Sequence, residues 1–155
     1  MKQDGFFRVA AASPVIRVAD CAQNVEAVLA ALQSAAADGA GAVVFPELCL
    51  TGYTCGDLFH DAALLAAAEK ALSCILQHTA TLPLVAVVGL PVAHGAALYN
   101  CAAVCCGGRL LGLTAKQSLP NYSEFYEARW FTPAPETPIP LHFAGQDTIL
   151  GSGLL

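Results

Sequence analysis

Two charged residues come directly after apolar segments, where an unpaired charge would be costly to bury. Glu47 follows Val43-Val44-Phe45-Pro46, and Lys116 follows the apolar run 110–115. Both runs are predicted strands, and ligands bind at the carboxyl ends of strands in open α/β sheets. Charged side chains in such places need partners. In the first of two interpretations they have a structural role, either as an ion pair or as side chains that extend into water at the rim of the sheet. In the second they form an acid/base pair in a pocket, where a perturbed pKa is useful for catalysis.

The acid/base interpretation makes a geometric demand on the two residues. One substrate amide can touch both side chains only if their tips lie within about 6 Å of each other. We therefore expect the two strand ends that carry Glu47 and Lys116 to be neighbours at one edge of the sheet.

The elements that must position them alternate between strand and helix. Apolar runs predict strands at residues 6–12, 42–45, 84–90, 97–105 and 110–115. Apolar residues at helical spacing predict helices over 20–37 and 61–79, with Asp20 as the N-cap of the first. Gly107-Gly108 predicts a hairpin turn, since glycine tolerates positive φ. We expect one α/β unit whose first three strands are parallel, because helices connect them.

The remaining segments are less regular. Residues 46–56 are expected to form a loop, 116–130 a structured loop with a short helix, and 132–140, which holds four prolines, an extended segment. Residues 141–155 have the composition of one or two strands.

The composition excludes several classes of function. Charged residues make up 12% of the chain and hydrophobic residues 56%, against roughly 25% charged in a typical domain. A net charge of −5 with seven Lys and Arg argues against nucleic-acid binding.

The uncharged stretch 71–108 is interrupted by proline, histidine and glycine, so no membrane span is expected. No export signal is recognisable, so a cytoplasmic location is expected. The seven cysteines and four histidines show no metal-ligand spacing, and the cysteines are expected to be free buried thiols.

Two motifs surround the charged residues. Phe45-Pro46-Glu47-Leu48-Cys49-Leu50-Thr51-Gly52-Tyr53 resembles the first signature of the nitrilase (carbon–nitrogen hydrolase) superfamily. Lys116-Gln117-Ser118-Leu119-Pro120-Asn121-Tyr122 resembles its lysine motif, and Glu127 matches a glutamate that often follows. Gly56-Asp57-Leu58-Phe59 and the segment 124–131 are more similar to the glutaminase domains of glutamine-dependent NAD synthetases than to free-standing nitrilases. The similarity runs from about Arg8 to Leu155.

The resemblance implies a fold and a reaction. The fold would be α/β, a partial nitrilase-type α-β-β-α sandwich with a mixed sheet flanked by two helices, and residues 1–155 would be the N-terminal part of one glutaminase domain. Family members hydrolyse an amide through a covalent thioester with Glu, Lys and Cys. Glu47 would match the general base and Lys116 the cation that stabilises charge on the substrate carbonyl oxygen.

The resemblance also implies a pocket for glutamine. Glu127 would orient Lys116 or the substrate amide, and Tyr122 would contact glutamine. Tyr53 and Phe125, from the same motifs, would complete the set of substrate-binding residues. For Tyr122, plain aromatic packing is an equally good interpretation.

The nucleophile is where this sequence departs from the family pattern. The family's cysteine lies in a Cys-Glu-Asp-type motif, and none of the seven cysteines here is followed by Glu-Asp. We therefore expect the nucleophile to lie outside this chain and the chain alone to be inactive. ATP and Mg would belong to a synthetase domain that is not represented, and no cofactor or metal is expected in these residues. Expected partners are glutamine, the rest of the glutaminase domain, the synthetase domain and a second copy of the chain.

Two other functional classes remain open at this point. One is a fragment of a stand-alone nitrilase-family amidase, which residues 56–59 argue against. The other is a non-catalytic module that self-associates through the apolar surface implied by the low charge content.

Overall fold

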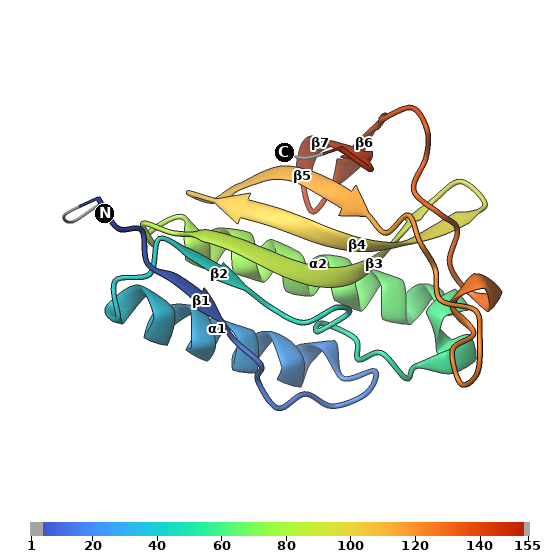
Figure 1. Cartoon of the computed structure of the whole chain (residues 1–155), viewed down its shortest axis with the longest axis horizontal. Coiled ribbons are helices and arrows are strands. Elements are labelled where there is room, and N and C mark those ends of the chain that lie inside the picture. Colours follow the sequence, from blue (N-terminus) through green and yellow to red (C-terminus); the bar gives the residue numbers. More distant parts are fainter. Residues whose placement is uncertain (1–4, 154–155) are drawn as a thin grey trace.

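A single seven-stranded mixed sheet organises the chain. The computed structural model describes residues 5–153, so the last two residues of the expected C-terminal strand region lie outside it. The strand order is β1-β2-β3-β4-β5-β7-β6, and the two long helices lie side by side against one face (Figure 1). The elements are β1 (Val9–Ala11), α1 (Cys21–Ala37), β2 (Ala42–Val44), η1 (Gly56–His60), α2 (Ala62–Thr79), β3 (Val85–His94), β4 (Ala97–Cys106), β5 (Arg109–Ala115), η2 (Glu127–Arg129), β6 (Ile139–Phe143) and β7 (Gln146–Gly151).

Each of the two long helices is preceded by an aspartate that serves as its N-cap. The side chain of Asp20 accepts a hydrogen bond from Gln23 N at 3.0 Å, and Asp61 accepts one from Ala63 N at 2.7 Å. These bonds satisfy backbone donors that have no partner within the first turn of a helix. Asp20 is thereby confirmed as the N-cap of α1.

Loss of this cap should destabilise the chain measurably. Asp20→Ala is expected to lower the free energy of unfolding by about 1 kcal/mol, because the amide of Gln23 loses its acceptor. Asp20→Asn keeps an acceptor oxygen and serves as the control, with most of the stability retained. Urea unfolding followed by circular dichroism measures both. An equal loss in the two variants would mean that the charge, not the cap, matters.

The strand pairing confirms the expected α/β arrangement. β1 pairs parallel with β2, and β2 parallel with β3. β4 and β5 form the expected hairpin, with Gly107 and Gly108 at φ +57° and +78°.

β3 is longer than the sequence predicted and continues through Pro91 to His94. β2 pairs with it only as far as Val44↔Val87. Pro91 therefore lies where β3 has one neighbouring strand, a place in which a missing N–H is tolerated.

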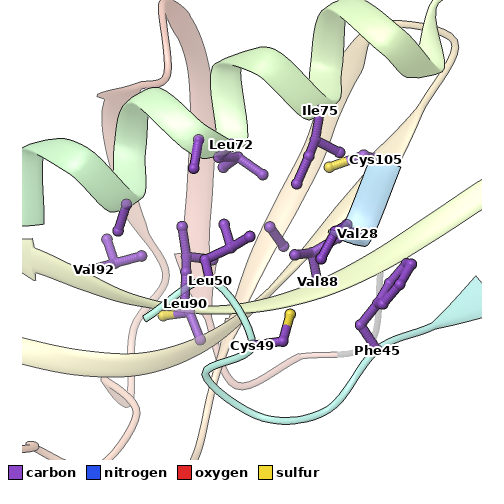
Figure 2. Packing of buried hydrophobic residues seen from close by; sticks show 14 of the residues in the cluster. Val28, Phe45, Cys49, Leu50, Leu72, Ile75, Val88, Leu90, Val92 and Cys105 are labelled. Atoms are coloured by element: carbon purple, nitrogen blue, oxygen red, sulfur yellow. The ribbon is translucent and has the colours of Figure 1, made fainter. Parts of the chain in front are cut away.

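The hydrophobic core lies between the helices and one face of the sheet. Figure 2 shows Val28 of α1 and Leu72 and Ile75 of α2 pointing toward Val88 and Leu90 of β3. All five side chains are fully buried.

The opposite face of the sheet carries no helix of the described residues and leaves Val9, Val44 and Ile149 half-exposed or more. Within residues 5–153, no helix is long and apolar enough to cross a membrane.

Candidate active site

Glu47 lies in a tight turn that follows β2. Phe45 N still donates to Val87 O at 2.9 Å, and the chain rejoins β3 where Leu50 N donates to Gly89 O at 3.2 Å. Between these points Leu48 adopts φ +53°, a conformation that is costly for residues other than glycine because the Cβ atom crowds the backbone. Such strain persists only where the surroundings enforce it.

Gly89 supplies the space for this turn. A Cβ atom on Gly89 would lie 2.4 Å from Leu48 N, 2.6 Å from Pro46 O and 2.9 Å from Glu47 C. Only a residue without a side chain allows the turn to lie over β3 at this point. The sequence analysis did not single out this glycine, although an isolated glycine in a strand is the signal for a close approach of backbone.

The turn also explains why the side chains of Glu47 and Lys116 lie close together. Lys116 Nζ lies 3.0 Å from Glu47 Oε1 and 3.1 Å from Oε2, so the predicted proximity is confirmed. The expectation that their strands are neighbours is wrong, because β3 and β4 lie between β2 and β5. The turn over Gly89 carries Glu47 across β3, and this closes the distance.

Asn100 of β4 joins both charged residues and was missed by the sequence analysis. Its side-chain Nδ2 donates to Glu47 Oε1, and its backbone oxygen accepts a hydrogen bond from Lys116 N at 2.8 Å. Asn100 is 3% exposed. A buried amide in an otherwise apolar strand was the available signal.

Glu127 and Tyr53 complete a continuous network. Lys116 Nζ donates to Glu127 Oε1 at 3.0 Å, and Tyr53 OH donates to the same oxygen at 2.7 Å. Glu127 is 2% exposed, and its second oxygen, Oε2, has no hydrogen-bond partner among the described residues. Buried carboxylate oxygens are normally satisfied, so Oε2 is an exception among the buried polar atoms of this site.

The network keeps Lys116 charged. Partial burial alone would lower its pKa, but hydrogen bonds to Glu127 and Glu47 outweigh this and raise the pKa of Lys116 above its ordinary value. Burial and the bond to Glu127 likewise raise the pKa of Tyr53. At neutral pH the site therefore presents an ammonium group and a neutral phenol, both of them hydrogen-bond donors.

A hollow of about 340 Å³ opens beside the ion pair, on the sheet face without helices. Its lining residues are Val44, Phe45, Glu47, Val87, Gly89, Asn100, Cys101, Ala102, Thr114, Ala115 and Lys116. Tyr122 and Phe125 belong to the neighbouring loop, where their rings lie 5.6 Å apart and Tyr122 is 69% exposed. The structure thus brings Glu47, Lys116, Glu127 and Tyr53 together, and leaves Tyr122 and Phe125 in an edge-to-face contact with each other.

The cysteines near Glu47 are poorly suited to nucleophilic attack. Burial raises the pKa of Cys49 to about 11, and it also raises the pKa of Cys55. Both thiols hydrogen-bond backbone carbonyls, Cys49 to Gly89 O and Cys55 to Thr51 O. A protonated, buried thiol is inert, which agrees with a nucleophile that lies elsewhere.

Comparison with known proteins shows which family the chain belongs to. The family model described as carbon-nitrogen hydrolase matches residues 8–152. The chain belongs to the carbon-nitrogen hydrolase family. Within this family it is 39% identical to the glutamine-dependent NAD(+) synthetase of Mycobacterium bovis over 153 residues, which is 99% of the chain and 22% of that protein. It is 40% identical to the Xylella fastidiosa enzyme of the same name over 127 residues, 81% of the chain and 23% of that protein.

Two solved structures share the fold of this chain. A glutamine-dependent NAD(+) synthetase from Cytophaga hutchinsonii superposes with a TM-score of 0.87 and 29% identity, over 94% of this chain and 25% of that one. An amidase from Nesterenkonia sp. superposes with a TM-score of 0.70 at 23% identity, over 91% of this chain and 53% of that one, a likeness of fold. The chain therefore spans about a quarter of the length of the synthetases it resembles.

Proposed function

We propose that this chain is the N-terminal part of a glutaminase domain that supplies ammonia for the ATP-dependent amidation of deamido-NAD to NAD. The observation that carries the proposal is the ammonium group of Lys116, held at 3.0 Å from both Glu47 and the buried Glu127. The similarity to two bacterial glutamine-dependent NAD(+) synthetases over most of the chain supports the choice of pathway.

The geometry supports a division of labour in amide hydrolysis. Glu47, 40% exposed beside the hollow, would take the proton of an approaching cysteine thiol and later activate water. The Lys116 ammonium would stabilise the negative charge that forms on the carbonyl oxygen when the thiolate attacks. Glu127 would hold Lys116 through Oε1 and so orient the ammonium group toward the substrate amide. Tyr122 and Phe125 would contact glutamine at the exposed rim.

ATP and Mg would be held outside these residues. The described residues contain no group of three or more His, Cys, Asp or Glu side chains placed to hold a metal ion. The sequence carries no glycine-rich phosphate loop between a strand and a helix. The amidation step is accordingly assigned to another part of a longer enzyme. A cytoplasmic location is part of the proposal, since all seven cysteines are free thiols, as is usual in a reducing compartment.

An isotope experiment tests the proposed function. The longer enzyme, supplied with glutamine labelled with ¹⁵N in its amide, deamido-NAD, ATP and Mg, should form NAD labelled in the carboxamide. Mass spectrometry detects the label. Label that stays in glutamine while unlabelled ammonia supports NAD formation would contradict the glutaminase assignment.

The 155-residue chain alone should release no ammonia from glutamine. A base and a stabilising cation without a thiolate provide no route to the thioester. A coupled glutamate dehydrogenase assay measures ammonia directly. Release that disappears in Cys49→Ala or Cys55→Ala would instead assign the nucleophile to this chain.

We further propose that isolated copies of this chain pair through the open face of the sheet. Val9 is 66% exposed, Val44 50% and Ile149 52% on strands of this sheet. Apolar strands are stable when both faces of a sheet are covered. Light scattering at micromolar concentration should show a dimer or larger species, and Val44→Lys should shift it toward monomer. Monomeric wild-type chain would contradict the pairing.

A further inference from the structure

A group of polar contacts outside the active-site network joins two segments that are distant in sequence. Asp57 lies in η1, and Arg129 and Trp130 lie at and after the end of η2. Asp57 Oδ1 accepts hydrogen bonds from Arg129 Nε at 3.0 Å and from Trp130 Nε1 at 3.1 Å, and Oδ2 accepts one from Arg129 Nη2 at 3.2 Å. We call these three residues the Asp57 clamp. It accounts for the motif 56–59, which the proposed reaction leaves without a role.

A buried aromatic layer sits directly beneath the clamp. Phe59 is fully buried, and its ring centroid lies 6.0 Å from that of Trp130 and 4.9 Å from that of Phe131. Tilted aromatic pairs at these separations are favourable contacts. The packing brings η1 and η2 together, and the three hydrogen bonds select one orientation of the indole and the guanidinium.

The clamp connects to the active site through the backbone of η2. The carbonyl oxygen of Glu127 accepts hydrogen bonds from Trp130 N at 3.0 Å and from Phe131 N at 2.8 Å. The carboxylate of the same residue binds Lys116 Nζ and Tyr53 OH. Trp130 is therefore joined by a backbone hydrogen bond to the residue that holds the Lys116 ammonium group.

We propose that the Asp57 clamp is a positioning device that fixes η2 and thereby holds the Glu127 carboxylate against Lys116 and Tyr53. The inference rests on the function proposed above and adds positioning residues to it. Asp57, Arg129 and Trp130 act through Glu127, without contacting the reacting atoms.

The exposure of the clamp suits a positioning role rather than a stabilising one. The side chains of Arg129 and Asp57 are 63% and 72% exposed, and ion pairs in such surroundings contribute little to global stability. Bonds from Arg129 and Trp130 lower the pKa of Asp57 to about 2, so the acceptor is ionised at neutral pH. Loss of the clamp should therefore loosen η2 and leave the fold intact.

The first experiment examines the clamp without reference to any reaction. Trp130 is the single tryptophan of the chain, so emission excited at 295 nm, where tyrosine absorbs little, reports on the surroundings of its indole in the clamp. Asp57→Ala removes the acceptor of the indole N–H and should shift the emission of the 155-residue chain, while the midpoint of urea unfolding stays near wild type. Arg129→Gln, which breaks the clamp from the other side, should shift it too. Asp147→Asn removes the other exposed pair, His142–Asp147, and should leave the emission unchanged. Unaltered emission in both clamp variants would overturn the inference.

The second experiment measures the effect on the proposed reaction in the longer enzyme. Asp57→Ala should lower kcat for glutamine-dependent NAD formation roughly 10-fold, because a misplaced catalytic group slows the chemical step. The rate with ammonia should not change. Since the two residues form one unit, the double variant Asp57→Ala/Arg129→Gln should be no slower than the worse single variant.

The outcomes separate the two proposals. If the wild-type enzyme forms no NAD from glutamine, the proposed function is wrong, while a fluorescence shift would still establish the clamp. If the wild-type enzyme uses glutamine and the clamp variants match it, the positioning role is wrong and the proposed function stands. Equal losses with glutamine and with ammonia would mean that the clamp serves overall folding, which would also overturn the positioning role.

Discussion

Replacing Glu47 with glutamine, or Lys116 with alanine, is expected to reduce glutamine-dependent NAD formation by the longer enzyme roughly 10³-fold. The amide that replaces the Glu47 carboxylate cannot take the proton of a thiol, and alanine at position 116 removes the ammonium group beside the hollow. Synthesis from free ammonia bypasses amide hydrolysis, so that rate should stay close to wild type. Steady-state assays with the two nitrogen donors give both rates.

Matched surface residues provide the controls for these two variants. Glu26 on α1 and Lys70 on α2 are exposed residues of the same types. Glu26→Gln and Lys70→Ala should leave both activities unchanged. If Glu47→Gln and Lys116→Ala abolished activity with glutamine and with ammonia alike, the two residues would serve folding or communication between domains, and their assignment to amide hydrolysis would be wrong.

The second large effect is expected at Gly89. Gly89→Ala should lower the free energy of unfolding by about 3 kcal/mol, because overpacking against rigid neighbours forces the backbone to move. The added Cβ would lie 2.4–2.9 Å from three backbone atoms of the Glu47 turn, and backbone cannot rotate away as a side chain can. The turn would lift from β3 and carry Glu47 away from Asn100 and Lys116. Urea unfolding measures the loss of stability.

Gly153→Ala is the control for this substitution. A Cβ there would have no heavy atom within 4 Å, so the stability should not change. A Gly89→Ala variant with wild-type stability would show that the turn can move at little cost. In the longer enzyme, such a variant with full glutamine-dependent activity would also show that the turn need not be held over β3 for Glu47 to act.

The features that could be predicted from the sequence are local ones, and the structure contains them. Asp20 caps α1 because an aspartate side chain can reach the amide of Gln23 within one turn. Gly107 and Gly108 form the hairpin because their conformations are intrinsic to glycine. Glu47 and Lys116 stand out because a charge after an apolar strand needs a partner. Each of these inferences involves residues close together in the chain.

Contacts across the sheet could not be predicted in the same way. Nothing near Glu47 in sequence indicates that Gly89 makes room for its turn, or that Asn100 donates to its carboxylate. The sequence predicted strands that contain Gly89 and Asn100, but which side chains lie next to one another on the same face depends on strand order and register.

The sequence by itself therefore determined the two long helices, the strands, the Asp20 cap, the hairpin and the identity of the charged pair. Only the tertiary structure decided that Glu47 reaches Lys116 across two intervening strands and that Asp57 binds η2 residues from η1. It also decided that Glu127 is buried, with one carboxylate oxygen that has no hydrogen-bond partner among residues 5–153. The physical reason is one of range. Propensities and caps are set by atoms a few residues apart, whereas the position of a catalytic group depends on the packing of segments 50 or more residues away, as with Asn100 and Glu47 at a separation of 53.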